Sequence, residues 1–327
     1  MTFSPFKRAR TDEADVDANA NANTNTNANM NVDDKKVNDV PLLQGNENDG
    51  KITDQDKDND QDKISDPSST DVKPDPVDSN ATSDKQQQEA QQQEENAKAV
   101  LLLKFLLFDK LQMNKASTVE QALIEVVQII AGHRGNCKRF YRLSGHCVLV
   151  LAMKKWTHHN NHQAIQRLCF CAVLHMAFQL PMKRTVFFEM GTMECIVKIM
   201  KNTTTGTTSS GSGSKAVDLH TYGLGALSNL FSAEVIPASQ KAATLFVHDL
   251  NGLALIVNSM SQFHRESEEI QQLGCLLLMN LSKHGNFKDY MLDADVLCAV
   301  SSAKTLYKDN EKINKWGSAC CHYLFDG

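Results

Sequence analysis

The sequence lacks the short motifs that many enzymes and metal sites share. No glycine-rich phosphate loop follows a strand, no strand is evident, and no nucleophile elbow, HExxH helix or paired-carboxylate motif occurs. No pair of the nine cysteines has zinc-finger spacing, and their number is odd. We therefore expect a protein that is not an enzyme and that uses no metal or other cofactor.

Apolar runs long enough to cross a membrane are also missing. The most apolar run, Ala99–Phe108, contains Lys104 and is about half of the ~20 residues that a spanning helix needs. The opening residues Phe3–Arg10 lack the apolar core of a signal peptide. All nine cysteines follow residue 96, mostly in apolar stretches, where cysteine acts as a small buried hydrophobe in a reducing compartment. We expect an intracellular protein without membrane contact.

The cellular location within that expectation stays open. Phe6–Arg10 is a short basic cluster of the kind that directs nuclear import, but such clusters also arise by chance. The sequence is therefore compatible with a cytoplasmic or a nuclear protein.

Residues 1–96 have few large apolar side chains and no cysteine. Asn recurs at every second position from Asn19 to Asn31, and clusters rich in Asp, Ser, Thr and Gln follow. Such a segment cannot bury enough apolar area to offset about 1–2 kcal/mol of backbone entropy per residue. We expect a disordered, acidic, low-complexity tail over residues 1–96 and a helical repeat domain over residues 97–327.

Charge divides at the same boundary. Residues 1–96 carry 10 basic and 22 acidic residues, a net charge of −12, whereas residues 97–327 carry 24 and 17, a net charge of +7. One hypothesis is that the acidic tail folds back on the basic body and inhibits it; the alternative is that the tail is only a solubilising segment.

A helical block recurs in the second part of the chain. It is clearest at His220–Leu230, returns loosely at Gln272–Leu281 and Trp316–Leu324, and is fainter at Leu168–Met176 and Gln121–Ile129. Its polar position, called the polar row below, consists of Gln128, His175, Asn229, Asn280 and Tyr323. The steps between these residues are 47, 54, 51 and 43 positions, a spacing that indicates stacked helical repeats.

A second motif, a tight turn that usually contains glycine, precedes an apolar segment in each repeat. The four turns are Leu143-Ser-Gly145, Glu189-Met-Gly191, Leu250-Asn-Gly252 and Leu292-Asp-Ala294. Glycine permits the left-handed backbone or the close approach that such a corner needs. Each repeat is therefore predicted as a short helix, a corner, a second helix, a polar loop and a long third helix. The predicted third helices are 117–132, 160–179, 215–232, 266–283 and 310–325, with caps at Ser117 or Thr118 and at Asn310.

The segment Gly252–Met260 followed by Glu269–Ser282 resembles an armadillo repeat, with its glycine corner and its Gln-x-x-Gly-Cys third helix ending in Asn-Leu. The likeness extends, more faintly, over residues 97–327. This part of the chain resembles the armadillo regions of leucine-rich-repeat kinases and other multidomain proteins. It implies an all-α fold, a right-handed armadillo-like α-solenoid whose third helices line the concave face.

Asparagine is a poor helix former, yet Asn229 and Asn280 occupy equivalent places in apolar helices. In the armadillo family this asparagine commonly holds the main chain of an extended peptide, so the resemblance implies a peptide-binding role for the polar row. The alternative is that each asparagine bonds a neighbouring repeat. We predict a non-enzymatic scaffold or adaptor that binds an extended segment of a protein in the concave groove.

The charge of the expected partner follows from two observations. Nuclear-import adaptors carry tryptophan one turn before the asparagine, where this chain has Gly225 and Leu276, so we do not expect it to bind basic localisation peptides. A net-positive body favours an acidic or mixed-charge segment. Nucleic acid is not favoured, because no stretch interleaves basic and aromatic residues.

Two further patterns concern the last repeat and a histidine cluster. Trp316, Tyr323 and Phe325 are expected to lie uncovered in the last repeat, which supports the alternative function of self-association or docking through the solenoid ends. The cluster His158, His159 and His162 has no cysteine or carboxylate partner, so we do not expect it to bind a metal.

Overall fold

The structure, a computed structural model, describes residues 115–157, 162–204, 213–232, 237–284 and 287–325. Every regular element in these ranges is helical. The predicted tail over residues 1–96, and the part of the predicted domain before residue 115, lie outside them. In the described ranges no single helix is long and apolar enough to cross a membrane. The helix α6 (Gln163–Gln179), followed by η3 (Pro181–Lys183) and α7 (Arg184–Glu189), passes by length and composition only, as a pair bent by 117°.

The described chain consists of one leading helix and four consecutive units of helices. The leading helix is α3 (Ala116–Ile130). Unit 1 comprises α4 (Arg134–Arg142), α5 (Gly145–Trp156) and α6 (Gln163–Gln179). Unit 2 comprises the 3-10 turn η3 (Pro181–Lys183) with α7 (Arg184–Glu189), then α8 (Thr192–Thr204) and α9 (Gly213–Leu230). Unit 3 comprises α10 (Pro237–Thr244) with the π-helical turn η4 (Leu245–Asp249), then α11 (Gly252–Gln262) and α12 (Glu268–Ser282). Unit 4 comprises α13 (Lys288–Asp293), α14 (Val296–Leu306) and α15 (Glu311–Phe325).

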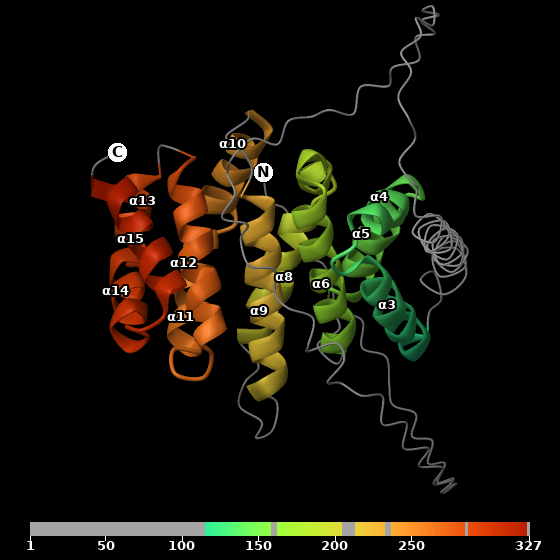
Figure 1. The fold of residues 1–327 in the computed structure, drawn as a ribbon, viewed down its shortest axis with the longest axis horizontal. Helices are drawn as coiled ribbons and strands as arrows, with labels where there is room; N and C mark the ends of the chain where they lie inside the picture. The colour runs from blue at the N-terminus through green and yellow to red at the C-terminus, as the bar shows by residue number, and fades with distance from the viewer. Residues whose placement is uncertain (1–114, 158–161, 205–212, 233–236, 285–286, 326–327) are drawn as a thin grey trace, which may run out of the picture.

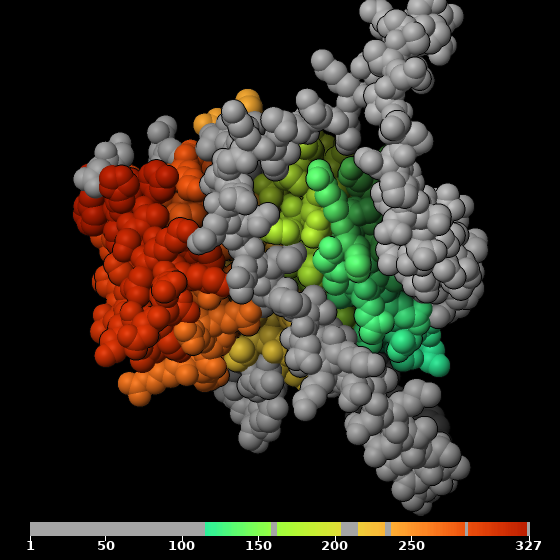
Figure 2. Space-filling view, viewed as in Figure 1, coloured from blue at the N-terminus to red at the C-terminus, as the bar shows by residue number. Residues whose placement is uncertain are grey.

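The units stack side by side, with α3 at one end of the described molecule and α15 at the other (Figure 1). The third helices α3, α6, α9, α12 and α15 each pack on the next, and the second helices α5, α8, α11 and α14 do the same. In the space-filling view the units follow one another as bands of colour (Figure 2). The predicted all-helical repeat architecture and its third helices are therefore confirmed, with ends that differ by only a few residues.

Periodic burial explains the helices. In α3 the buried residues recur at three- and four-residue spacing, as in Val119, Leu123 and Val126.

The prediction of a helix cap was right for α15, where the Ile313 amide donates to the Asn310 side chain over 2.9 Å. It was wrong for α3, which begins at Ala116 with no side-chain cap, so that Ser117 and Thr118 lie inside its first turn.

The corners before the second helices share one backbone feature. A residue in the left-handed region occurs at each of them: Ser144, Gly191, Asn251 and Asp295. Only one is glycine, because Asn, Asp and, less often, Ser tolerate this conformation. Relative to units 1 and 3, the predicted alignment of the turns was therefore displaced by one residue in unit 2 and by two residues in unit 4.

Glycine has a different task in units 1 and 3, where it follows the left-handed residue. A Cβ atom on Gly145 would lie 2.5 Å from the Phe140 ring, and one on Gly252 would lie 2.2 Å from the Phe246 ring. Both rings are fully buried. These glycines allow the start of the second helix to approach the aromatic side chain of the first helix.

Cysteine burial largely agrees with the prediction. Six of the nine are buried, and burial raises the pKa of the Cys137 thiol to about 12, which keeps it protonated. Cys298 was expected in the apolar interior of a helix, but the structure exposes it on the surface of α14, because it does not lie on the inward stripe of that helix.

Candidate functional site

The third helices form a continuous face, and the polar row lies at a constant register on it. Each member follows a small residue by six positions, and these small residues are Ala122, Cys169, Gly223, Gly274 and Gly317. A Cβ atom on Gly223 would lie 2.6 Å from the Met200 sulfur, and one on Gly274 would lie 2.6 Å from Met260. In units 2, 3 and 4 the glycine thus lets the second helix pack closely against the third, which favours the same rotation of the third helix in these units.

The members of the polar row differ in exposure. Gln128 on α3 is exposed, and Tyr323 on α15 is 40% exposed. Asn229 on α9 is half-buried, whereas Asn280 on α12 is 3% exposed and His175 on α6 is 1% exposed. Burial lowers the pKa of His175 to about 4, so this imidazole is neutral near pH 7. The packing of successive third helices brings the five residues into one line, but only part of that line reaches the surface.

Both asparagines donate a hydrogen bond to the preceding third helix. Asn229 Nδ2 donates to the Leu174 carbonyl, and Asn280 Nδ2 donates to the Ser228 carbonyl, each over 3.0 Å. The accepting residue comes immediately before the polar-row residue of the previous unit. The inter-repeat bonding that the sequence left as an alternative is therefore present. Peptide binding by the polar row stays a prediction.

We expect Asn280→Ala to lower the free energy of unfolding by about 1–3 kcal/mol, because it removes the donor to the Ser228 carbonyl in a buried place. Asn229→Ala serves as the comparison, with a smaller expected loss because Asn229 is half-buried and water can replace its side chain. Urea unfolding followed by circular dichroism measures both. Equal losses, or no loss for Asn280→Ala, would contradict this assignment.

Charged side chains form a second line on the same face, near the start of the third helices. We call Arg167, Asp218, Glu269 and Lys312 the charged edge. Asp218, Glu269 and Lys312 share one register position, five residues before Gly223, Gly274 and Gly317. Arg167 on α6 pairs with Asp218 on α9 over 3.5 Å, which links two units. The charges therefore run positive, negative, negative, positive from α6 to α15.

The electrostatics of the charged edge show that its members interact. The pKa of Glu269 is raised, first by partial burial and then by the Asp218 carboxylate, while Lys312 opposes the rise. The pKa of Tyr222 is raised mainly by burial, with contributions from Cys171, Asp218 and Glu269. Two carboxylates thus lie close together at the centre of the edge, next to an aromatic side chain.

The charged edge was not among the predicted site residues. Its signal in the sequence is the shared register of Asp218, Glu269 and Lys312, which lies eleven residues before the polar row. Between the two lines, Leu276, Trp316 and Ala319 are half-buried and give the face an apolar component. The face therefore combines a charged edge, an apolar strip and the exposed members of the polar row.

In the described part of the chain, no group of three or more His, Cys, Asp or Glu residues is placed to hold a metal ion. His162 instead packs edge-on against Trp156, with 4.6 Å between ring centroids. His158 and His159 lie outside the described residues.

Comparisons with known proteins establish the fold. No protein-family model matches the sequence, and no curated protein matches it. A designed armadillo repeat protein is 14% identical with a TM-score of 0.54, over 72% of this chain and 85% of that one. Another, in complex with the peptide (KR)4, is 15% identical with a TM-score of 0.52, over 72% and 84%. A third, designed computationally for modular peptide recognition, is 16% identical with a TM-score of 0.51, over 68% and 82%.

At these identities the likeness concerns the fold. The described chain is an armadillo-like α-solenoid, as the resemblance in the sequence implied. Such a scaffold serves many functions, so the function has to be argued from the third-helix face itself.

Proposed function

We propose that this armadillo-like solenoid is a non-enzymatic scaffold that binds an extended segment of a partner protein along its third-helix face. The observation that carries the proposal is the constant register of the polar row on five helices that pack in series, together with the charged edge on four of them. A surface that repeats from unit to unit matches a ligand that also repeats, and an extended main chain is such a ligand.

The dimensions support the proposal. Packed helices lie about 8–10 Å apart and an extended chain rises about 3.3 Å per residue, so each unit would meet every third residue of a bound segment. Exposed Gln128, half-buried Asn229 and Tyr323 offer polar groups at three of the five units. Amide and phenol groups both donate and accept hydrogen bonds, as a peptide unit requires.

The charged edge narrows the expected partner to a segment of mixed charge. Asp218 and Glu269 at the centre of the edge favour a basic side chain there, whereas Arg167 and Lys312 at its ends favour acidic side chains. The net positive charge of residues 97–327 is therefore a poor guide to the face, whose centre is acidic.

The alternative function, assembly through the solenoid ends, receives less support from α15. The buried Cys275, Leu278 and Met279 of α12 have as their equivalents Ser318, Cys321 and His322 in α15. Ser318 and His322 are exposed and polar, as expected for a terminal repeat that covers the stack. Trp316 is half-buried, although Tyr323 and Phe325 are exposed as predicted.

A peptide selection followed by titration tests the proposal. Linear peptides selected from a random library on the full chain provide the probe, and fluorescence anisotropy measures their dissociation constants. We expect Glu269→Lys and Tyr323→Ala each to weaken binding roughly tenfold, because each removes a charge-assisted or aromatic contact. Thr305→Ala on the exposed surface of α14 is the matched control and is expected to bind as the unchanged protein does.

Circular dichroism melts of the same variants separate loss of binding from loss of fold. Unchanged peptide affinity in Glu269→Lys and Tyr323→Ala, with unchanged melts, would show that the peptides bind elsewhere and would reject the proposed groove.

A further inference from the structure

In units 1 and 2, a lysine at the end of the second helix reaches the corner of the following unit. Lys201, ten residues after the corner residue Gly191, reaches into unit 3 and donates from Nζ to the Leu250 carbonyl over 2.7 Å. That carbonyl comes directly before Asn251, the left-handed corner residue of unit 3. Lys154 is at the same register in unit 1, and its Nζ lies 3.9 Å from the place a Cβ would take at Gly191, the corner of unit 2. In both cases an ammonium group lies at the corner of the following unit.

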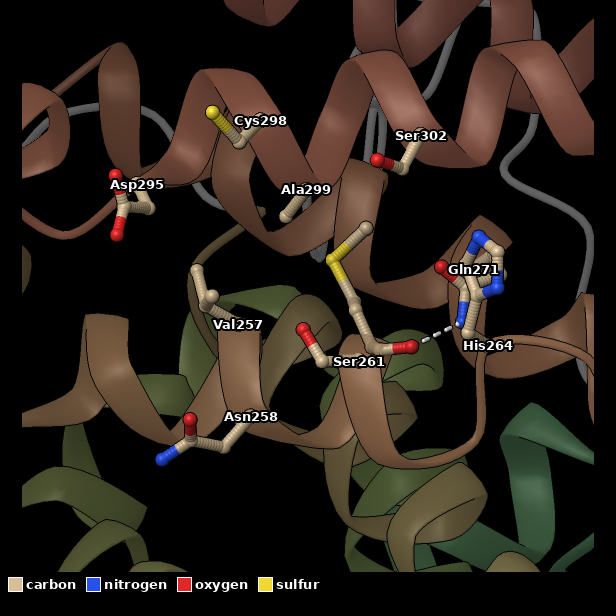
Figure 3. A pocket seen from close by; sticks show the side chains of 10 residues that line it. Val257, Asn258, Ser261, His264, Gln271, Asp295, Cys298, Ala299 and Ser302 are labelled. Atoms are coloured by element: carbon tan, nitrogen blue, oxygen red, sulfur yellow. Dashed lines mark hydrogen bonds between the residues drawn. The ribbon is translucent and has the colours of Figure 1, made fainter.

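Unit 3 lacks this lysine, and a cleft occurs where it would lie. The equivalent residue is Ser261, whose side chain is too short to reach the corner of unit 4. A cleft of about 570 Å³ lies between α11 and α14 at this boundary. Figure 3 shows the side chains of Val257 and Ser261 on α11 pointing towards α14 across it.

The lining of the cleft is rich in hydrogen-bond acceptors. It includes the carboxylate of Asp295, which is the corner residue of unit 4, and the hydroxyls of Ser261 and Ser302. Neither lysine nor arginine is among the lining residues. Gln271 lines one end, where it is 1% exposed and donates from Nε2 to the Met260 carbonyl over 2.8 Å (Figure 3).

The other atom of that amide, Gln271 Oε1, is buried without a hydrogen-bond partner. The preceding boundary shows why. There the equivalent residue, His220, has its Nδ1 2.8 Å from the Ser259 hydroxyl of the next unit. At the boundary with the cleft, the residue equivalent to Ser259 is Ala303, which has no hydroxyl. A buried acceptor without a donor is costly, so this end of the cleft favours a ligand that supplies an N–H group.

We propose that the cleft between α11 and α14 binds the primary ammonium group of a lysine side chain presented by a partner protein. The incoming ammonium takes the place that Lys154 and Lys201 fill from within the chain at the two earlier boundaries. At the corner its donors match the Asp295 carboxylate, while the peptide N–H groups that flank the lysine match the serine hydroxyls and the Gln271 amide oxygen farther along the cleft. The cleft lies between second helices, so this site is separate from the third-helix face and does not depend on the function proposed for that face.

A titration followed by ¹H–¹⁵N NMR on the full chain tests the site. The probe is the capped peptide acetyl-Gly-Lys-Gly-amide, and the control is the same peptide with norleucine, which keeps the aliphatic stem but lacks the ammonium group. We expect saturable shifts of the backbone amides of Ser261, Asp295 and Cys298 with the lysine peptide only. Butylamine, an ammonium without a peptide, is expected to bind more weakly. Equal affinities for butylamine and the lysine peptide would overturn the assignment to a protein's lysine.

Two variants locate the binding. Ser261→Lys places a lysine where units 1 and 2 have one. It is expected to raise the melting temperature and to weaken binding of the lysine peptide roughly tenfold. Asp295→Asn removes the carboxylate while keeping a residue that adopts the left-handed corner, as Asn251 does, and is expected to weaken binding similarly. Thr305→Lys is the matched control, because it places the same charge at the same register in unit 4, outside the cleft. Shifts with the norleucine peptide, or equal binding by Ser261→Lys and Thr305→Lys, would disprove the site.

Discussion

Replacing Gly252 with alanine is expected to lower the free energy of unfolding by about 3 kcal/mol. The new methyl group would lie 2.2 Å from the Phe246 ring, well inside van der Waals contact. The ring cannot move away easily, because it is fully buried and its centroid lies 5.3 Å from that of Phe231. Overpacking of this kind typically costs 1–3 kcal/mol, and the rigidity of the aromatic pair places the expected loss at the upper end.

Urea unfolding of the full chain measures the loss, and the chain offers a matched control. A Cβ atom on Gly135 in α4 would meet nothing within 4 Å, so Gly135→Ala is expected to be neutral or slightly stabilising. Phe246→Leu in the background of Gly252→Ala is expected to recover part of the stability, because the smaller side chain vacates the contact. A neutral Gly252→Ala, or a double variant whose losses simply add, would contradict the close-approach argument.

The second large effect is expected at acidic pH, where buried histidines become costly. Burial lowers the pKa of His220 to about 4, and that of His175 to about 4. An unfolded histidine has a pKa near 6.5, so between about pH 6.5 and pH 4 the unfolded chain binds protons that the folded chain does not. The contribution of the neutral histidines to the free energy of unfolding is therefore fully present above pH 6.5 and is lost as the pH is lowered towards 4. Each histidine is expected to contribute a loss of about 3 kcal/mol over that window.

Replacing His220 with glutamine isolates one of these contributions. Glutamine already occupies the equivalent positions, as Gln166 and Gln271, so the helix packing accepts it. We expect the wild-type protein to lose more stability than His220→Gln when urea unfolding at pH 7.5 is compared with that at pH 4.5. Parallel losses in the two proteins would show that His220 is protonated in the folded state and would contradict its low pKa.

The repeats were predictable because they depend on local periodicity. The apolar spacing within α9 and α12 requires helices with one buried stripe, and the return of that pattern about every 50 residues requires neighbours that cover it. The corners were predictable for the same reason, but not their register. Left-handed backbone at Ser144, Asn251 and Asp295 shows that a glycine in the turn does not by itself identify the residue that needs this conformation.

The candidate site was only partly predictable. The sequence located the polar row, but not the direction of the Asn229 and Asn280 amides, because a hydrogen bond to the previous unit depends on how two helices are placed. The pairing of Arg167 with Asp218 joins residues 51 positions apart, and its partners become neighbours only when α6 packs on α9. The sequence alone does not show which charged residues, so far apart in the chain, will pair.

The amino-acid sequence by itself determined the helices, their order, the four corners and the common register of the third helices, since each follows from side-chain pattern within about one repeat. Tertiary structure alone decided which side chains meet across unit boundaries: the bond from Asn280 to Ser228, the two carboxylates beside Tyr222, and the cleft where Ser261 stands in place of a lysine. The physical reason is that contacts between units depend on the distance and rotation of packed helices, which result from the volume of every side chain between them.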